Sequence, residues 1–211
     1  MSLETIYQAV LDGDAKATEA AVKAALIAQV PPEDILHKAC IPAMGEVGRQ
    51  FEEGEKYVPE MLISARAMQT AVALVKPLLA KEKLQSAGKV VVGTIQGDLH
   101  DIGKNLVGMM LEGSGFEVVD LGTDVSPQKM IDAVRQHQPQ VVGMSALLTT
   151  TMPAMRKCID ALKEAGLRDT VKVLIGGAPV TEAFANQIGA DGYASDASSA
   201  ARKAKALLGV A

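Results

Sequence analysis

The sequence predicts an N-terminal four-helix bundle cap followed by a C-terminal α/β domain of the flavodoxin-like (Rossmann-like) type, built on a five-stranded parallel sheet. The first third of the chain has apolar residues at helical spacing and many alanines. From residue 89 onward, short β-branched runs alternate with helical stretches. A polar segment that ends in glycine, KEKLQSAG, separates the two patterns. We therefore expect a cap domain over residues 1–83, a linker over 84–88 and a sheet domain over 89–211.

The cap is expected to hold four helices. They are predicted over Leu3–Leu11, over Asp14–Gln29, from about Glu33 to Phe51, and from Val58 through Leu74. Pro31 and Pro32 begin the third helix, where proline in the first turn is tolerated, and Pro77 is expected to kink or end the fourth. Helices of this length form a small bundle.

The second domain is expected to alternate strands and helices. Strands are predicted at 89–94, 116–121, 141–145, 171–175 and 192–194, and helices at 103–112, from Ser126–Pro127 to before Pro139, and at 152–165, 181–187 and 197–208. The uninterrupted run Val90–Val92 is typical of a strand that is buried on both faces. Ligands of such sheets bind beyond the carboxyl ends of the strands. The loops at those ends are therefore where a binding site is expected.

Composition excludes several classes of function. The 211 residues carry a net charge of -4 and only six aromatic side chains (three Tyr, three Phe and no Trp), which disfavours a nucleic-acid surface. Cys40 and Cys158 are far apart and in no CxxC motif, so neither a disulfide framework nor a thiolate metal site is indicated. The N-terminal residues do not resemble a signal peptide, and no apolar run approaches the ~20 residues of a membrane span. A cytoplasmic protein is expected.

Four predicted loops share the carboxyl edge of the sheet. They are Gln96–Asn105, Ser145–Thr151, Gly176–Pro179 and Ser195–Ser198. A nucleotide site is disfavoured, because no GxGxxG follows the first strand and Asn105 stands where a P-loop has Ser or Thr. An aspartyl phosphoacceptor at Asp98 or Asp101 would leave His100 unexplained.

His100 is better suited to binding a metal. A neutral imidazole is a good ligand when an acceptor holds its other ring N–H, and Asp98 can supply that acceptor. One His and one Asp cannot cage a zinc ion, which takes several protein ligands. A single protein imidazole makes sense when the metal arrives in a macrocycle. Gly97 and Gly103 allow the backbone to approach a bulky, flat ligand.

Three motifs carry a family resemblance. Asp98-Leu99-His100-Asp101-Ile102-Gly103 matches the DxHxxG signature of cobalamin-binding domains, Ser145-Ala146-Leu147 matches their SxL element, and Gly176-Gly177 their GG element, in the right order. The N-terminal part resembles the helical cap of the family around Met44–Gly48, Phe51 and Val58–Pro59. The chain is similar to the small corrinoid methyl-carrier proteins of methyltransferase systems and to the cobalamin-binding module of methionine synthase.

The resemblance implies base-off, His-on binding, in which His100 replaces the lower base of the cofactor on cobalt. Asp98 and Thr151 would relay a proton to His100. Asp101 and Ile102 belong to the same motif. The displaced tail would run past Gly176 and Gly177, where a Cβ would clash with it. The other residues implied in binding are Ser145, Thr149 and Ala197 along the tail, Leu147 of the SxL element, and Phe51 and Val58 over the methyl face.

The resemblance also implies function and partners. The cobalt would take a methyl group from a substrate-specific methyltransferase and give it to an acceptor methyltransferase with a pterin or thiol acceptor. A reductive activation protein would be a further partner, and neither nucleic acid nor membrane is expected to be one. The chain would be a carrier subunit, non-catalytic alone. Three alternatives remain: an adenosylcobalamin-binding mutase module, a cobalamin-sensing regulator, and a flavodoxin-like protein without a corrinoid.

Overall fold

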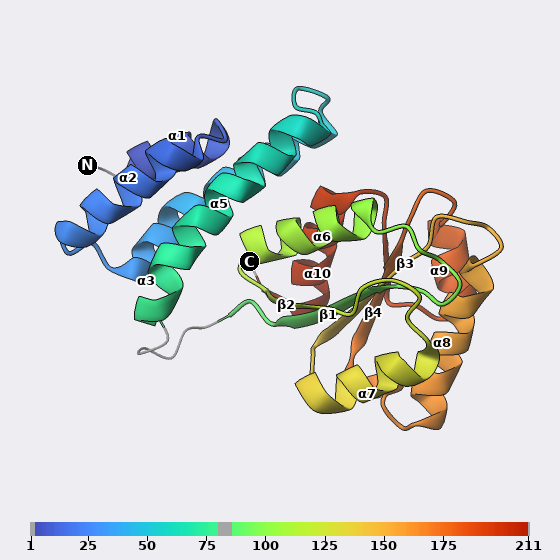
Figure 1. Cartoon of the computed structure of the whole chain (residues 1–211). Helices are drawn as coiled ribbons and strands as arrows, with labels where there is room; N and C mark the ends of the chain where they lie inside the picture. Colours follow the sequence, from blue (N-terminus) through green and yellow to red (C-terminus); the bar gives the residue numbers. More distant parts are fainter. Residues whose placement is uncertain (1–2, 80–85, 211) are drawn as a thin grey trace. The chain divides into compact units, whose positions relative to one another are not determined.

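The computed structural model describes residues 3–79 and 86–210 of the chain. These residues form two compact units, one of helices and one built around a sheet (Figure 1). Part of the predicted linker, residues 84 and 85, lies outside the described residues. Within 3–79 and 86–210, no helix has both the length and the apolar character that are needed to cross a membrane.

The first unit contains the expected helices, with one departure from the pattern. Its elements are α1 (Leu3–Leu11), α2 (Ala15–Ile27), α3 (Pro32–Ile35), the π-helical turn Leu36–Cys40, α4 (Ile41–Glu52) and α5 (Val58–Leu79). The predicted third helix is thus one run that widens in the middle, where Ile41 N–H bonds to Leu36 O. Pro42 follows this turn, and its missing N–H and bulky ring explain why the regular ladder is broken. Helix α5 continues past Pro77 to Leu79.

The core of this unit is apolar. Its largest fully buried side chains include Ile6, Ile35, Met44 and Met61, which come from four of its helical segments. Asp14 is the N-cap of helix α2, and its carboxylate accepts a hydrogen bond from Ala17 N at 2.9 Å. This cap satisfies a donor that the first turn leaves unpaired.

The second unit is built on a five-stranded, fully parallel sheet with the order β2-β1-β3-β4-β5. The strands are β1 (Lys89–Thr94), β2 (Glu117–Asp120), β3 (Val141–Ser145), β4 (Lys172–Gly176) and β5 (Gly192–Ala194). The predicted strands at 89–94, 141–145 and 192–194 have the observed bounds, and the other two differ by one residue at each end. The register pairs Thr94 with Ser145 and Ser145 with Gly176. Three strands therefore end side by side.

Helices cover both faces of the sheet (Figure 1). They are α6 (Ile102–Gly113), α7 (Pro127–His137), α8 (Met152–Glu164), the 3-10 turn Arg168–Thr170, α9 (Glu182–Ile188) and α10 (Ala197–Leu208). Helices α7, α8 and α9 bury one large apolar cluster against the sheet, with members such as Val91, Met130, Val142 and Ile159. Since both faces are covered, the exposed backbone lies at the strand ends, where the loops project.

Candidate functional site

Asp98 and His100 form the centre of the site, in the loop that follows β1. The Asp98 side chain is fully buried, and its Oδ1 lies 2.7 Å from Nδ1 of His100. The same Oδ1 accepts a hydrogen bond from the His100 backbone N–H at 3.1 Å. Thr94, the last residue of β1, donates its hydroxyl to His100 O at 2.8 Å. The imidazole is therefore held through its ring and its backbone.

The other carboxylate oxygen of Asp98 binds the loop after β3. Oδ2 accepts hydrogen bonds from Leu147 N at 2.8 Å, Leu148 N at 3.3 Å and Thr151 Oγ1 at 2.8 Å. Burial opposes ionisation of this carboxyl, but the hydrogen bonds from Leu147, His100 and Thr151 outweigh it and hold the pKa of Asp98 well below its usual value of 3.8. The family resemblance implies a hydroxyl at Thr151 that acts with the His–Asp pair, and in the structure this hydroxyl donates to Asp98 Oδ2; its role in proton transfer stays a prediction.

The second nitrogen of the half-exposed His100 ring is available for a ligand. A carboxylate at Nδ1 is an acceptor, so the neutral ring carries its proton on Nδ1 and has a lone pair on Nε2. The side chain is 52% exposed, and no described residue hydrogen-bonds to Nε2. A neutral imidazole that is fixed in this way is ready to bind a metal.

Large apolar side chains are exposed in the two loops that Asp98 connects. Leu99 is 73% exposed, Ile102 is 75% exposed, and Leu147 and Leu148 are also exposed. All four lie in, or directly after, the two loops that Asp98 connects. Exposed apolar side chains gathered at one edge are typical of a ligand or partner surface. A metal held in a flat organic ring fits such a rim, because the ring covers the apolar groups.

The glycines of the site divide into two groups. Gly97 has a φ of +86° and Gly177 a φ of +128°, and a Cβ on Gly177 would lie 1.9 Å from Ala146 O. A Cβ on Gly176 would lie 2.9 Å from Ala194 O. The sequence interpretation assigned the pair Gly176–Gly177 to the cofactor tail, and the structure adds that the chain's own backbone already excludes a side chain there. By contrast, a Cβ on Gly103 would meet nothing within 4 Å.

Gly103 leaves space in the first turn of α6. This glycine is exposed and has an ordinary helical φ. Glycine in a helix costs up to about 1 kcal/mol relative to alanine. A Cβ here would contact none of the described residues within 4 Å, so packing among them does not require a glycine, whereas a bulky ligand against the His100 loop would use that space. The residues at this edge therefore fit a metal-bearing macrocycle.

The remaining predicted residues are placed as follows. Ser145 is half-buried at the end of β3, Thr149 is exposed in the following turn, and Ala197 is buried at the start of α10. Asp101 is exposed and accepts a hydrogen bond from Asn105 Nδ2 at 3.2 Å. Phe51, half-buried near the end of α4, and Val58, exposed at the start of α5, belong to the first unit, and their assignment to the site stays a prediction. Contacts of Ser145, Thr149, Ala197 and Asp101 with a cofactor also stay predictions.

Sequence reasoning missed Asp124. Its Oδ1 accepts a hydrogen bond from Gly97 N at 2.8 Å, and its own N–H donates to Asp98 O at 3.0 Å. The available signal was its position, since Asp124 follows the second predicted strand and therefore lies at the same sheet edge as His100. Lys104 and Asp120, which form an ion pair, were also missed.

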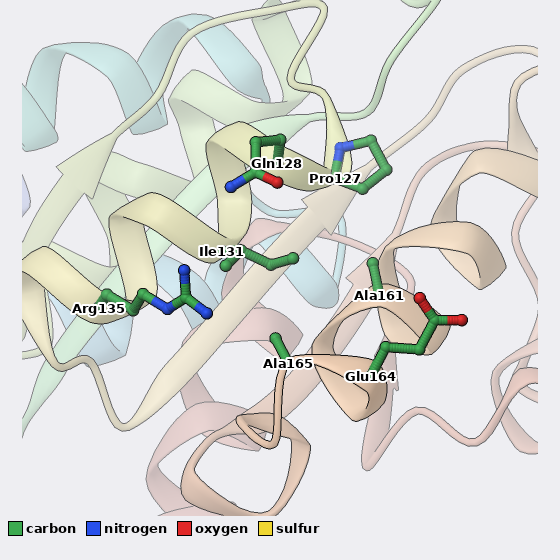
Figure 2. A pocket seen from close by; sticks show the side chains of 7 residues that line it. All are labelled: Pro127, Gln128, Ile131, Arg135, Ala161, Glu164 and Ala165. Carbon is green, nitrogen blue, oxygen red and sulfur yellow. The ribbon is translucent and has the colours of Figure 1, made fainter.

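Two other features lie apart from this site. A groove between α7 and α8, lined by residues such as Ile131, Arg135 and Glu164, contains none of the predicted site residues (Figure 2). Cys40 and Cys158 are buried, and burial raises the pKa of each thiol to about 12. Neither is a ready metal ligand at neutral pH, because the thiolate is the form that binds metals.

The carboxylate-held imidazole and the exposed apolar side chains at the carboxyl edge of the parallel sheet agree with the predicted cobalamin-binding domain. Residues 88–202 match a family described as B12 binding domain, and residues 2–76 match a second family of the same description. The chain belongs to the B12-binding corrinoid proteins, and its cofactor is a corrinoid. The predicted fold class, family and cofactor are thus confirmed.

Similar proteins cover nearly the whole chain. The trimethylamine corrinoid protein of Methanosarcina barkeri is 43% identical over 205 residues, which are 96% of this chain and 94% of that protein. Dimethylamine corrinoid protein 3 of Methanosarcina acetivorans is 46% identical over 193 residues, 92% of this chain and 90% of that one. Among solved structures, the methanol:cobalamin methyltransferase complex MtaBC of Methanosarcina barkeri contains a chain with a TM-score of 0.87 and 32% identity, matched over 98% of this chain and 79% of that one.

Proposed function

We propose that this chain carries methyl groups on the cobalt of its corrinoid, with His100 Nε2 as the lower axial ligand in place of the cofactor's own base. The methyl group comes from a substrate-specific methyltransferase and goes to a second methyltransferase with a pterin or thiol acceptor. The observation that carries the proposal is the half-exposed His100 ring, held at Nδ1 by the buried Asp98 carboxylate at 2.7 Å.

Each site residue has a task in this function. The bound corrinoid supplies a metal centre that can accept and release a methyl group. Asp98 keeps the His100 proton on Nδ1, so that Nε2 remains free to bind the metal. Thr151 donates to Asp98 Oδ2 and, being almost buried, links the pair to the loop after β3, which makes it the route for a proton to and from the His–Asp pair. The exposed apolar side chains of Leu99 and Ile102 would help to exclude water from a bound corrinoid.

Names of similar proteins support a methylated amine as the methyl donor. Relatives at 43% and 46% identity are named for trimethylamine and dimethylamine, whereas the chain in the methanol complex is 32% identical. The partners would then be a methylamine methyltransferase, an acceptor methyltransferase and a reductive activation protein. Two free, buried cysteines are consistent with a reducing compartment, and we propose the cytoplasm.

The test is spectroscopic. The whole chain, labelled with ¹⁵N, is reconstituted with hydroxocobalamin and reduced by one electron, and the electron paramagnetic resonance of the cobalt is recorded. One ¹⁵N nucleus from the protein should split the axial signal into doublets, where the unlabelled chain gives triplets. His100→Ala should lose this splitting. His137→Ala, at the far end of α7, should keep it.

The proposal is overturned if the labelled wild-type chain shows only ¹⁴N splitting, because the cofactor would then have kept its own base. The carrier role needs a second measurement. The reconstituted chain should accept a methyl group from trimethylamine or dimethylamine only in the presence of the matching methyltransferase. Transfer from methanol with its methyltransferase, and not from the amines, would contradict the proposed donor.

A further inference from the structure

The loop that joins β2 to α7 runs along the end of β1. Thr94 N donates to Gly122 O at 3.0 Å, and Val125 N donates to Thr94 O at 2.9 Å. Ile95 and Val125 form an isolated parallel bridge. These bonds extend the β1–β2 pairing beyond both strands, so this loop lies beside the start of the His100 loop without contributing a ligand.

Asp124 joins the two loops by both its backbone and its side chain. Its Oδ1 accepts from Gly97 N at 2.8 Å, and its N–H donates to Asp98 O at 3.0 Å. Asp124 has a φ of +52°, one of three non-glycine residues with positive φ in the described chain. Aspartate and asparagine tolerate this left-handed conformation better than most residues, but glycine adopts it more readily. The side chain that an aspartate brings to this position is used, since its Oδ1 accepts the hydrogen bond from Gly97 N.

A second connection holds the far end of the His100 loop. Lys104, in the first turn of α6, is 3% exposed and forms an ion pair with Asp120, the last residue of β2. Its ammonium also donates to Asn105 Oδ1 at 2.6 Å. Asp120 Oδ1 accepts from Gly122 N at 2.8 Å, so this pair is tied to the same β2–α7 loop. Burying an ammonium is costly unless it is paired, which makes this connection specific.

We infer that residues 120–125 act as a clamp that positions the His100 loop from both ends. Asp124 holds its beginning at Gly97 and Asp98, and the pair Asp120–Lys104 holds its end. Asp124 and Lys104 are thus positioning residues, which act through Asp98 and His100 and do not touch the metal. The inference rests on the proposed function, in which the imidazole so positioned is the cobalt ligand.

Two substitutions separate the hydrogen bond of Asp124 from its backbone conformation. Asp124→Gly keeps the left-handed conformation and removes the acceptor, whereas Asp124→Asn keeps both. In the chain without cofactor, hydrogen exchange of the Gly97 amide should accelerate about tenfold in Asp124→Gly and stay near wild type in Asp124→Asn. The dissociation constant for hydroxocobalamin should rise about ten- to a hundredfold in Asp124→Gly, with a weakened ¹⁵N splitting from His100, and remain close to wild type in Asp124→Asn.

The ion pair between Lys104 and Asp120 is tested in a similar way. Lys104→Met should weaken hydroxocobalamin binding about tenfold or more, and the double variant with Asp124→Gly should lose more than either single one. Lys157→Met, which removes an exposed lysine on α8, is the control and should bind like wild type. The clamp would be overturned if Asp124→Gly and Lys104→Met both bound hydroxocobalamin with wild-type affinity and showed the wild-type ¹⁵N splitting from His100. Absence of ¹⁵N splitting in wild type would overturn the proposed function, a distinct result.

Discussion

His100 Nδ1 lies 2.7 Å from Oδ1 of Asp98, while the other oxygen of that carboxylate accepts three hydrogen bonds from the loop after β3. The two oxygens therefore have different partners and different tasks. Oδ1 fixes the tautomer of the imidazole, and Oδ2 fixes the carboxylate to the sheet edge. Because the two oxygens of Asp98 have different partners, the effect of a neutral amide at this position can be predicted.

Asp98→Asn should leave His100 in the wrong tautomer. Three donors face the Oδ2 position, so the amide oxygen should turn toward them and its NH₂ toward His100 Nδ1. Nδ1 must then accept and Nε2 carries the proton, which prevents it from binding a metal. We expect hydroxocobalamin affinity to fall by about ten- to a hundredfold, measured by absorbance titration, and the unfolding free energy to fall by about 1–3 kcal/mol.

Asp132→Asn is the matched control for this variant. It makes the same change of charge at an exposed residue of α7, where the side chain accepts a hydrogen bond from Gln128. Its affinity should stay within about threefold of wild type, as for a surface change of about 0.5 kcal/mol. Equal losses in Asp98→Asn and Asp132→Asn would contradict the tautomer argument, since the loss of one charge would then explain both.

Sequence reasoning succeeded where a pattern reports directly on structure. Alternating strands and helices gave the parallel sheet, and its carboxyl edge located the loops of His100 and Ser145. The position of Asp124 after the second strand was a signal, but its role was not found, because that residue acts through a left-handed backbone and a bond to a main-chain amide. The π-helical turn at Leu36–Cys40 was missed for a related reason, since apolar spacing does not report the local hydrogen-bond pattern. Gly176 and Gly177 were found, but their contacts with Ala194 and Ala146 are visible only in three dimensions.

Acid should destabilise the chain without cofactor through Asp98. Burial favours the neutral form, but the hydrogen bonds that Asp98 accepts lower its folded pKa below the usual 3.8. A group with a lowered folded pKa adds stability that is fully present above its unfolded pKa, and it loses that stability as the pH falls toward the folded pKa. We therefore expect the unfolding free energy, measured by urea titration, to fall below about pH 4.

The Asp98→Asn variant provides the comparison for this acid dependence. It has no carboxyl at this position, so its unfolding free energy should decline less steeply between about pH 4 and pH 2 than that of wild type. The two curves should converge as the pH falls. Parallel curves over this range would mean that Asp98 contributes no proton-linked stability.

Two glycines of the site should respond oppositely to alanine. In Gly177→Ala the new Cβ would lie 1.9 Å from Ala146 O at a φ of +128°, so the backbone itself must move. We expect a loss of more than about 3 kcal/mol in unfolding free energy. In Gly103→Ala the Cβ meets nothing within 4 Å, and alanine is the better helix former. That variant should unfold at the same or a higher urea concentration, yet bind hydroxocobalamin more weakly, because the methyl group would occupy open space in the first turn of α6, directly after the His100 loop, which the proposed corrinoid would use. Gly103→Ala with wild-type affinity would show that the ring does not approach the first turn of α6.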